Sequence, residues 1–157
     1  MKKTKIIEAM LLTSLLGVNL SAYDADLAKK FDETFSQYSQ DFLNNSKMLV
    51  DANSVMKMLQ KKEGFVLLDI RTPAEMRVLG LKTKNTLEIP FDHLFKKENL
   101  DRLPKDRPLV IVCHSGSRAL QAATALEMIG FKNAKVLYGG IIALAQSDST
   151  KSAPAVK

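Results

Sequence analysis

The chain has 157 residues, of which 46% are apolar and 25% charged, and its formal net charge is +6. This length and composition suit one globular domain with a short extra segment, and they exclude a repeat array or a largely disordered chain. The basic residues are interspersed with acidic ones rather than clustered with aromatic residues, so the excess charge does not indicate a nucleic acid partner. A single cysteine, Cys113, excludes an internal disulfide.

The first 22 residues have the pattern of an export signal. Three lysines precede an apolar stretch at 6–20, which is too short and too interrupted to span a bilayer well, and a small-residue cleavage site follows, ending at Ala22. We expect a signal peptide over 1–22, cleavage after Ala22, and an exported, periplasmic-type mature protein with no membrane association. Glu8 interrupts the apolar stretch, and the alternative is a segment retained as a membrane anchor.

An amphipathic helix is expected next, within an N-terminal extension over residues 23–47. Apolar residues recur there at spacings of three and four, which is the period of one helix face, and the pattern predicts a helix from Tyr23 to about Asn45. The residues of this stripe are Leu27, Phe31, Phe35, Tyr38 and Phe42. The stripe either packs on its own domain or forms the contact of a homodimer.

Residues 48–146 alternate between short apolar runs and helical patterns. Thr72 is expected as the N-cap of one helix, with Pro73 in its first turn. Strands are expected at 48–50, 65–68, 87–89, 109–112 and 134–137, and the other helices at 52–61, 94–103, 119–129 and 141–146. Apolar runs without polar alternation, separated by helices, indicate an α/β fold with a parallel sheet covered on both faces. The polar tail at 147–157 is expected to be disordered.

The segment from Cys113 to Arg118 lies between the strongest strand and a helix, at the carboxyl end of that strand, where parallel sheets bind ligands. Its small residues allow the backbone to curl, so that amide N–H groups and the helix N-terminus surround an anion. We interpret the segment as an anion cradle with the Cys113 sulfur at its rim, able to stabilise a thiolate. The cradle consists of His114, Ser115, Gly116, Ser117 and Arg118. The alternative for Cys113 is a small buried apolar residue.

The two histidines do not indicate a metal site. His114 is either a base or a residue that lines the mouth of the cradle and contacts the substrate, and His93 is expected on a helix surface. Two histidines and one cysteine at these separations do not match a zinc motif. We therefore expect no metal and no cofactor.

Four motifs resemble the rhodanese superfamily, and they occur in the family's order. They are CHSGSRA at 113–119, which follows Cys-x-x-Gly-x-Arg and a small residue; LDIRTPAE at 68–75, which follows Asp-x-Arg-x-Pro-x-Glu; Ile89-Pro90; and Tyr138-Gly139-Gly140. The resemblance extends over roughly 49–146. It implies a rhodanese-like three-layer fold with a central five-stranded parallel sheet, to which the N-terminal amphipathic helix is added.

The resemblance also implies a sulfurtransferase. The Cys113 thiolate is expected to take sulfane sulfur from thiosulfate, polysulfide or a partner's persulfide, hold it as a persulfide, and pass it to a thiophilic acceptor. Small sulfur-containing anions and protein persulfides are the expected partners. Arg118 either assists an anionic donor or points outward to an acidic partner. Asp69 and Arg71 are expected to support the loop by ion pairing rather than to react.

Two other functions stay open. One is a noncatalytic interaction module, because many rhodanese-like domains serve as docking units. The other is a Cys-dependent phosphatase, since related phosphatases share the fold, although their loop has five residues between Cys and Arg and this chain has four. The sequence also departs from the family at 79–86, where Gly-His-Ile-Pro-Gly-Ala is usual, and this departure bears on substrate preference and on the partner surface.

Overall fold

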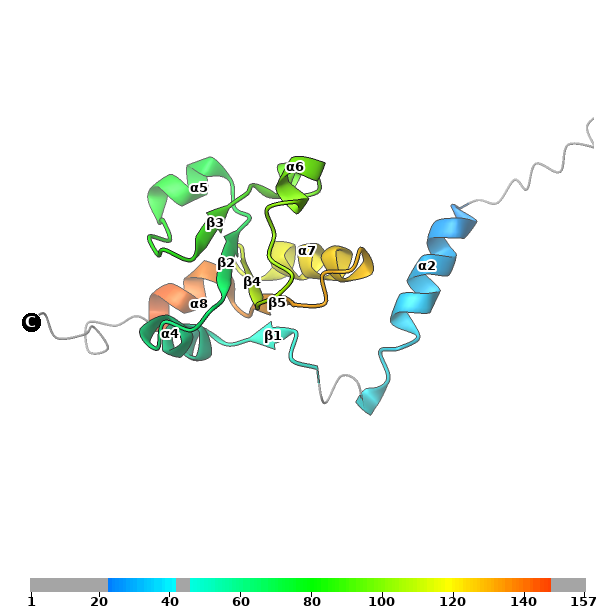
Figure 1. The fold of residues 1–157 in the computed structure, drawn as a ribbon, viewed down its shortest axis with the longest axis horizontal. Coiled ribbons are helices and arrows are strands. Elements are labelled where there is room, and N and C mark those ends of the chain that lie inside the picture. Colours follow the sequence, from blue (N-terminus) through cyan, green and yellow to red (C-terminus); the bar gives the residue numbers. More distant parts are fainter. Residues whose placement is uncertain (1–22, 42–45, 148–157) are drawn as a thin grey trace, which may run out of the picture. The chain divides into compact units, whose positions relative to one another are not determined.

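The fold is that of a computed structural model, which describes residues 23–41 and 46–147. The chain divides into two compact units, Met1–Leu43 and Asn44–Lys157 (Figure 1). The expected signal peptide and, apart from Ser147, the expected tail lie outside the described residues. None of the described helices is long and apolar enough to cross a membrane.

The N-terminal unit contains helix α2 (Ala25–Phe35), which begins at Asp24, whose side chain accepts a hydrogen bond from the Leu27 N–H at 2.9 Å. The prediction of one helix to about residue 45 was wrong, because α2 ends at Phe35. Serines follow at 36 and 39, and their hydroxyls compete for backbone hydrogen bonds, which disfavours helix. None of the α2 side chains is buried, and whether its apolar stripe forms a homodimer contact stays a prediction.

The second unit is built on five parallel strands, and this confirms the predicted α/β class. The strands are β1 (Leu49–Val50), β2 (Val66–Asp69), β3 (Thr86–Glu88), β4 (Leu109–Val112) and β5 (Ala134–Leu137). They are ordered β1-β5-β4-β2-β3, so β4 is the central strand. All four residues of β4 are buried, as expected for a run of apolar, mostly β-branched residues in a sheet covered on both faces.

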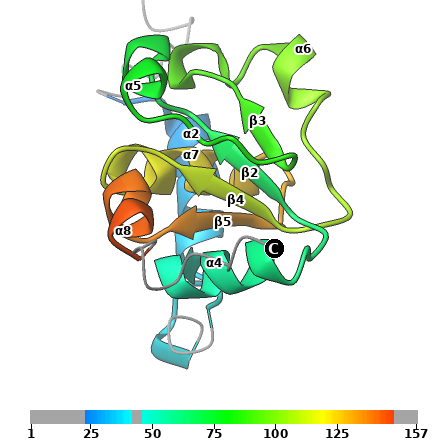
Figure 2. The same ribbon diagram turned by 90° about the vertical axis from the view of Figure 1, so that its left-hand side faces the viewer.

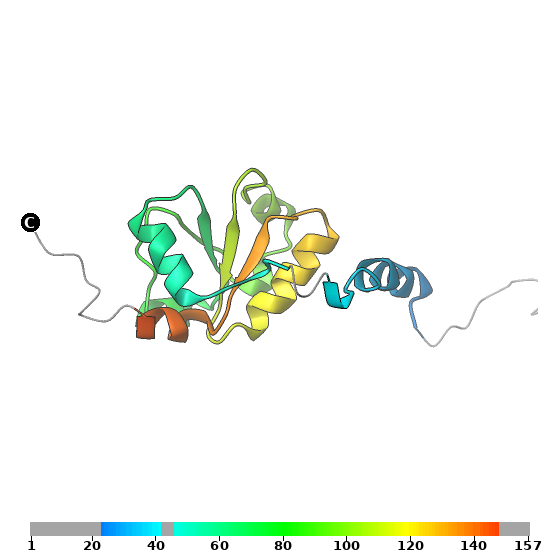
Figure 3. The same cartoon turned by 90° about the horizontal axis from the view of Figure 1, so that it is seen from below.

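Helices cover the two faces of the sheet, and the strands lie between α4 (Ala52–Gln60) and α7 (Ser117–Met128) (Figure 3). Helix α8 (Gly140–Ser147) packs beside α4 (Figure 2). The side chains of β4 alternate between two cores. Those on the α7 side are Leu109, Ile111 and, at the strand end, Cys113, whereas Val110 and Val112 face α4 and α8. The alternation therefore places Cys113 on the α7 side.

The segment that follows β3 is less helical than predicted. Instead of one helix over 94–103, a 3-10 turn (Phe91–His93) is followed by a single turn of α-helix, α6 (Lys97–Leu100). The backbone of Lys96 is extended, which interrupts the helix. The side-chain amide of Asn99 donates a hydrogen bond to the carbonyl oxygen of His93 at 2.8 Å. His93 thus lies in a 3-10 turn rather than on the surface of a helix.

Candidate active site

The candidate site is the turn that joins β4 to α7. Helix α7 begins at Ser117, directly after Gly116, whose φ of +105° lies in the left-handed region that favours glycine. A Cβ atom at Gly116 would also come within 3.4 Å of the Gly139 nitrogen. The glycine therefore lets the chain turn from strand to helix within a few residues and pack closely on the segment that follows β5.

Two main-chain N–H groups point at the Cys113 sulfur. The Gly116 N–H donates to Sγ at 3.1 Å and the Ala119 N–H at 3.4 Å. Both groups lie at the N-terminus of α7, where helix N–H groups have no intrahelical partner and carry partial positive charge. This arrangement stabilises negative charge on the sulfur.

Cys113 lies deeper than the sequence indicated. Its sulfur was expected at the rim of the cradle, but the residue is fully buried. Its side chain lies in the core on the α7 side together with Ala119, which has no exposed surface either. The parts of the loop that solvent reaches most are His114, Ser115 and Ser117.

The carbonyl side of the loop is held by α8. The Ile141 N–H donates to the Cys113 carbonyl oxygen at 2.9 Å, and the Ile142 N–H donates to that of His114 at 3.4 Å. Gly140 makes this approach possible, because a Cβ there would lie 2.5 Å from both carbonyl oxygens. Since the C=O and N–H of a trans peptide point in opposite directions, these bonds turn the next two N–H groups away from α8.

Arg118 forms an ion pair with Glu75, the last residue of the motif at 68–75. The guanidinium donates two hydrogen bonds to the carboxylate, at 2.6 and 3.0 Å, across 43 residues of sequence. Thr72 completes the cluster through a capping box, with its N–H donating to Glu75 at 2.9 Å. The acidic partner of Arg118 is thus a residue of the same chain.

The two charges of this cluster influence each other and the sulfur. The hydrogen bond from Arg118, aided by the N–H and hydroxyl of Thr72, lowers the pKa of Glu75 to about 2. Glu75 in turn raises the pKa of Arg118, and the Cys113 side chain adds a smaller contribution in the same direction. The charge of Arg118 therefore acts mainly on the Glu75 carboxylate and to a smaller extent on the sulfur. The capping-box spacing Thr72-x-x-Glu75 was the signal in the sequence, but it gives no hint of Arg118.

Asp69 and Arg71 form a buried ion pair at the neighbouring strand end. The Arg71 Nη2 atom lies 2.6 Å from the Asp69 carboxylate, and Nε donates to it at 2.9 Å. Their exposed fractions are 0% and 2%. In the sheet Asp69 lies beside Val112, the residue before Cys113. The pair is thus placed to fix the end of β2 against the strand that carries the cysteine.

Among the predicted site residues, the structure brings together Cys113, Gly116 and Arg118, with Ala119 and Glu75 as additional members. His114 has an exposed side chain, and the hydrogen bonds that the described residues give to Sγ come from main-chain N–H groups. Within 23–41 and 46–147 there is no group of three or more His, Cys, Asp or Glu side chains that could hold a metal ion.

Comparison with known proteins gives a family match over most of the second unit. The family model described as Rhodanese-like domain matches residues 51–147. A sulfurtransferase of Allochromatium vinosum is 39% identical over 97 residues, which cover 62% of this chain and 87% of the relative. A probable adenylyltransferase/sulfurtransferase MoeZ of Mycobacterium tuberculosis is 35% identical over 80 residues, or 51% of this chain, but this match spans only 20% of that protein's length.

Solved structures give the same fold. A rhodanese-related protein from Thermoplasma volcanium superposes with a TM-score of 0.53 at 23% identity, covering 68% of this chain and 95% of that one. At this identity the likeness extends to the fold alone, and it agrees with the five-stranded parallel sheet described above.

Proposed function

The chain belongs to the rhodanese-like domain family, and on that premise we propose that it is a sulfurtransferase that carries sulfane sulfur as a persulfide on Cys113. One observation carries the proposal. The Cys113 sulfur accepts hydrogen bonds from the N–H groups of Gly116 and Ala119 at the start of a helix. Such donors stabilise a thiolate or a persulfide anion without a metal or a neighbouring base.

The proposed reaction has two displacements at sulfur. The Cys113 thiolate attacks the sulfane sulfur of thiosulfate, the S–S bond of the donor breaks, and sulfite leaves with the bonding electron pair. An acceptor thiolate then attacks the outer sulfur of the Cys113 persulfide, which regenerates the Cys113 thiolate. Polysulfide and a partner's persulfide can replace thiosulfate as the donor. The leaving group is then a shorter polysulfide or the partner's thiolate, respectively.

The loop contributes mainly electrostatic stabilisation. Hydrogen bonds to charged groups contribute about 1.5–3 kcal/mol each, and two such donors act on the same sulfur. The Arg118 guanidinium adds positive charge beside the sulfur, partly offset by Glu75. Because Cys113 is buried, sulfur exchange requires the loop to open, and we assign this movement to its exposed residues His114, Ser115 and Ser117.

The pairing of Arg118 also argues against a phosphatase. A phosphate dianion is bound best by two parallel N–H groups of a guanidinium, and here the Nη1 and Nη2 atoms of Arg118 already donate in this way to Glu75, at 3.0 and 2.6 Å. The four residues between Cys113 and Arg118 make the turn too short for the five-residue phosphatase loop. The two N–H groups that donate to the Cys113 sulfur argue against a noncatalytic docking module, because docking does not require a stabilised sulfur anion.

A turnover assay tests the proposal. With thiosulfate as donor and a small thiol as acceptor, the wild-type protein is expected to release sulfite, and Cys113→Ser is expected to release none. His114→Ala serves as the matched loop variant and retains most of the activity, since the main chain supplies the stabilisation. Sulfite release by Cys113→Ser would overturn the proposal, as would a wild-type protein that transfers sulfur neither from thiosulfate nor from polysulfide. Hydrolysis of p-nitrophenyl phosphate would instead support a phosphatase.

We also propose that the protein is exported and cleaved after Ala22. The support is the pattern of residues 1–22 alone. Mass spectrometry of the protein recovered from cells is expected to give Tyr23 as the first residue. Recovery of the uncleaved N-terminus in the membrane fraction would favour a retained anchor.

A further inference from the structure

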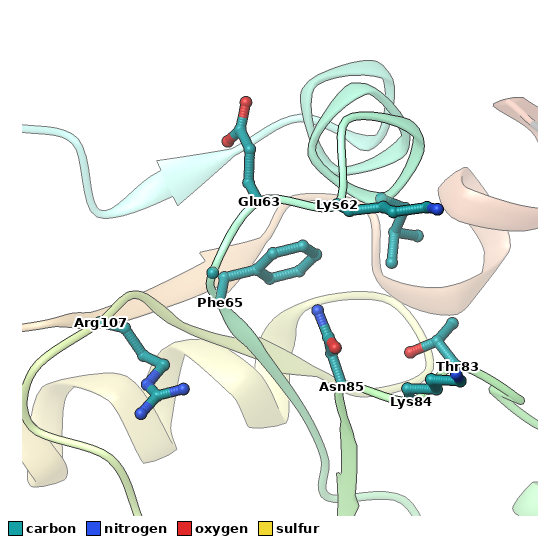
Figure 4. Close-up of a pocket in the computed structure, with 9 residues that line it drawn as sticks. Lys62, Glu63, Phe65, Thr83, Lys84, Asn85 and Arg107 are labelled. Atoms are coloured by element: carbon teal, nitrogen blue, oxygen red, sulfur yellow. The ribbon is translucent and has the colours of Figure 1, made fainter.

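Residues 79–85, within the segment 79–86 where the sequence departs from the rhodanese pattern, line two hollows away from the Cys113 loop. The first, here called the basic pocket, has a volume of about 430 Å³ and lies at the amino ends of β2 and β3 (Figure 4). The residues used to define it are Lys62, Phe65, Thr83, Lys84, Asn85 and Arg107. The second, the apolar groove, has a volume of about 280 Å³. It is defined by Met56, Leu59, Leu79, Leu81, Ile141 and Leu144.

The basic pocket gathers positive charge that is scattered in the sequence. Lys62, Lys84 and Arg107 come from three different loops and line it together with one acidic residue, Glu63. The Glu63 carboxylate points away from the Phe65 ring and the Asn85 amide, which lie toward the interior of the pocket (Figure 4). Arg107 also contacts Asp106 at 3.1 Å, but that pair is exposed on both sides and weak. Basic residues thus outnumber acidic ones in the lining of the pocket, and this favours an oxyanion as the ligand.

Lys62 has a left-handed backbone conformation, which is unusual for a residue other than glycine. Its φ of +55° is the only positive value among the described residues other than glycine, and it directly follows the C-cap of α4, where glycine is preferred. A residue with a Cβ in this region costs about 1–2 kcal/mol. Strained residues cluster at functional sites, and here the side chain concerned is a cation at the edge of a pocket.

The apolar groove adjoins the basic pocket, since Leu59 and Thr83 line both. Its walls are α4, α8 and the start of the divergent segment, all of which contribute aliphatic side chains. The two hollows together have cations and polar atoms at one end and aliphatic side chains at the other. This arrangement suits an amphipathic molecule with an anionic head and an apolar chain. Volumes of this size are close to those of small-molecule sites.

We propose that the basic pocket and the apolar groove form one binding site for a small, soluble amphipathic anion. Its oxyanion head lies between Lys62 and Lys84, with Thr83 and Asn85 as hydrogen-bonding groups, whereas Arg107 lies on the opposite side of the pocket (Figure 4). Its apolar chain extends past Leu59 into the groove, between Leu81 and α8. The site is separate from Cys113 and independent of the sulfur chemistry proposed above.

Calorimetric titration of the full chain with butyl, hexyl and octyl phosphate, each kept below its micelle concentration, tests the site. We expect Kd to fall along the series, by up to about fourfold for each methylene that the groove buries. Lys84→Gln is expected to weaken binding of all three about three- to tenfold. Leu81→Ser is expected to flatten the dependence on chain length. The matched control is Lys57→Gln, which removes the same charge from an exposed position of α4 outside the pocket.

Several results would overturn the proposal. One is the absence of saturable binding at millimolar concentration, and another is equal affinity for the three alkyl phosphates. Equal weakening by Lys84→Gln and Lys57→Gln would show an effect of overall charge. Binding to vesicles of phosphatidylglycerol without binding to the soluble alkyl phosphates would identify a lipid surface instead. The Cys113→Ser variant is expected to bind like the wild type, and loss of binding there would place the anion at the cysteine loop.

Discussion

The two edges of the sheet are built in different ways. At the carboxyl edge the main chain packs so closely that a Cβ on Gly140 would lie 2.5 Å from the carbonyl oxygens of Cys113 and His114. At the amino edge, a Cβ on Gly64 or Gly130 would meet nothing within 4 Å. The carboxyl edge therefore depends on backbone geometry, and substitutions there disturb the cysteine loop. The amino edge depends on side chains, and substitutions there change charge and shape without moving the backbone.

The largest effect is expected at the carboxyl edge from Asp69→Ala. This change leaves the buried Arg71 guanidinium without its partner, and the free energy of unfolding is expected to fall by about 3–5 kcal/mol, measured by urea denaturation. The double variant Asp69→Leu/Arg71→Met removes both charges and is expected to cost less than the single change. A loss under about 1 kcal/mol for Asp69→Ala would contradict the supporting role of the pair.

A matched pair of glycine substitutions compares the two edges directly. Gly140→Ala adds a Cβ that clashes with two carbonyl oxygens at a φ of +61°, so a loss of about 2–5 kcal/mol is expected. Gly130→Ala has a positive φ of +103° but open space, so only the conformational cost of about 1–2 kcal/mol is expected. Thermal unfolding measures both. Equal losses would mean that the close approach at Gly140 is unimportant.

Lys62→Gly at the amino edge is expected to act in the opposite direction. Glycine adopts the left-handed conformation of this position without strain, so stability is expected to rise by up to about 1 kcal/mol, while octyl phosphate binds more weakly. Urea denaturation and calorimetry measure the two effects on the same sample. A variant that is less stable than the wild type would show that the Lys62 side chain contributes to folding rather than to binding.

The smallest effect is expected from Glu75→Gln, and it depends on pH. Arg118 and Thr72 lower the folded-state pKa of Glu75 from 4.5 to about 2. A carboxyl whose pKa is lower in the folded state stabilises the protein above its unfolded pKa, and this contribution is lost as pH falls from about 4.5 to about 2. The pair is partly exposed, so we expect a difference of at most about 1 kcal/mol at pH 7.

Stability measured from pH 7 to pH 2 checks this expectation. The difference between the wild type and Glu75→Gln is expected to be constant above about pH 4.5 and to shrink below it. A difference that stays constant to pH 2 would contradict the pairing of Glu75 with Arg118. Arg118→Gln removes the main cause of the low pKa and is expected to reduce the same dependence on pH.

Short-range patterns account for what the sequence predicted well. The apolar run at 109–112 and the run at 134–137 became β4 and β5 with the expected bounds, and Thr72 became the N-cap of α5 (Pro73–Val78). The cysteine loop was located because it follows directly from a buried strand. The helix expected at 94–103 failed because an extended residue, Lys96, interrupts it, and a pattern of apolar spacing does not reveal this.

Contacts between distant residues account for what the sequence did not predict. Arg118 and Glu75 lie 43 residues apart and meet only because α5 and α7 both start at the carboxyl edge. Lys62, Lys84 and Arg107 looked scattered along the chain, yet the amino edge of the parallel sheet brings their loops together. The carbonyl groups of Cys113 and His114 likewise contact α8, which approaches the loop closely at Gly140.

The central claim is that Cys113 carries sulfur, and intact mass measurement after incubation with thiosulfate or polysulfide tests it most directly. The account predicts that the wild-type protein gains the mass of one sulfur atom, that a thiol acceptor removes it, and that Cys113→Ser gains nothing. A wild-type protein that gains no sulfur, or an adduct that persists in Cys113→Ser, would contradict the account.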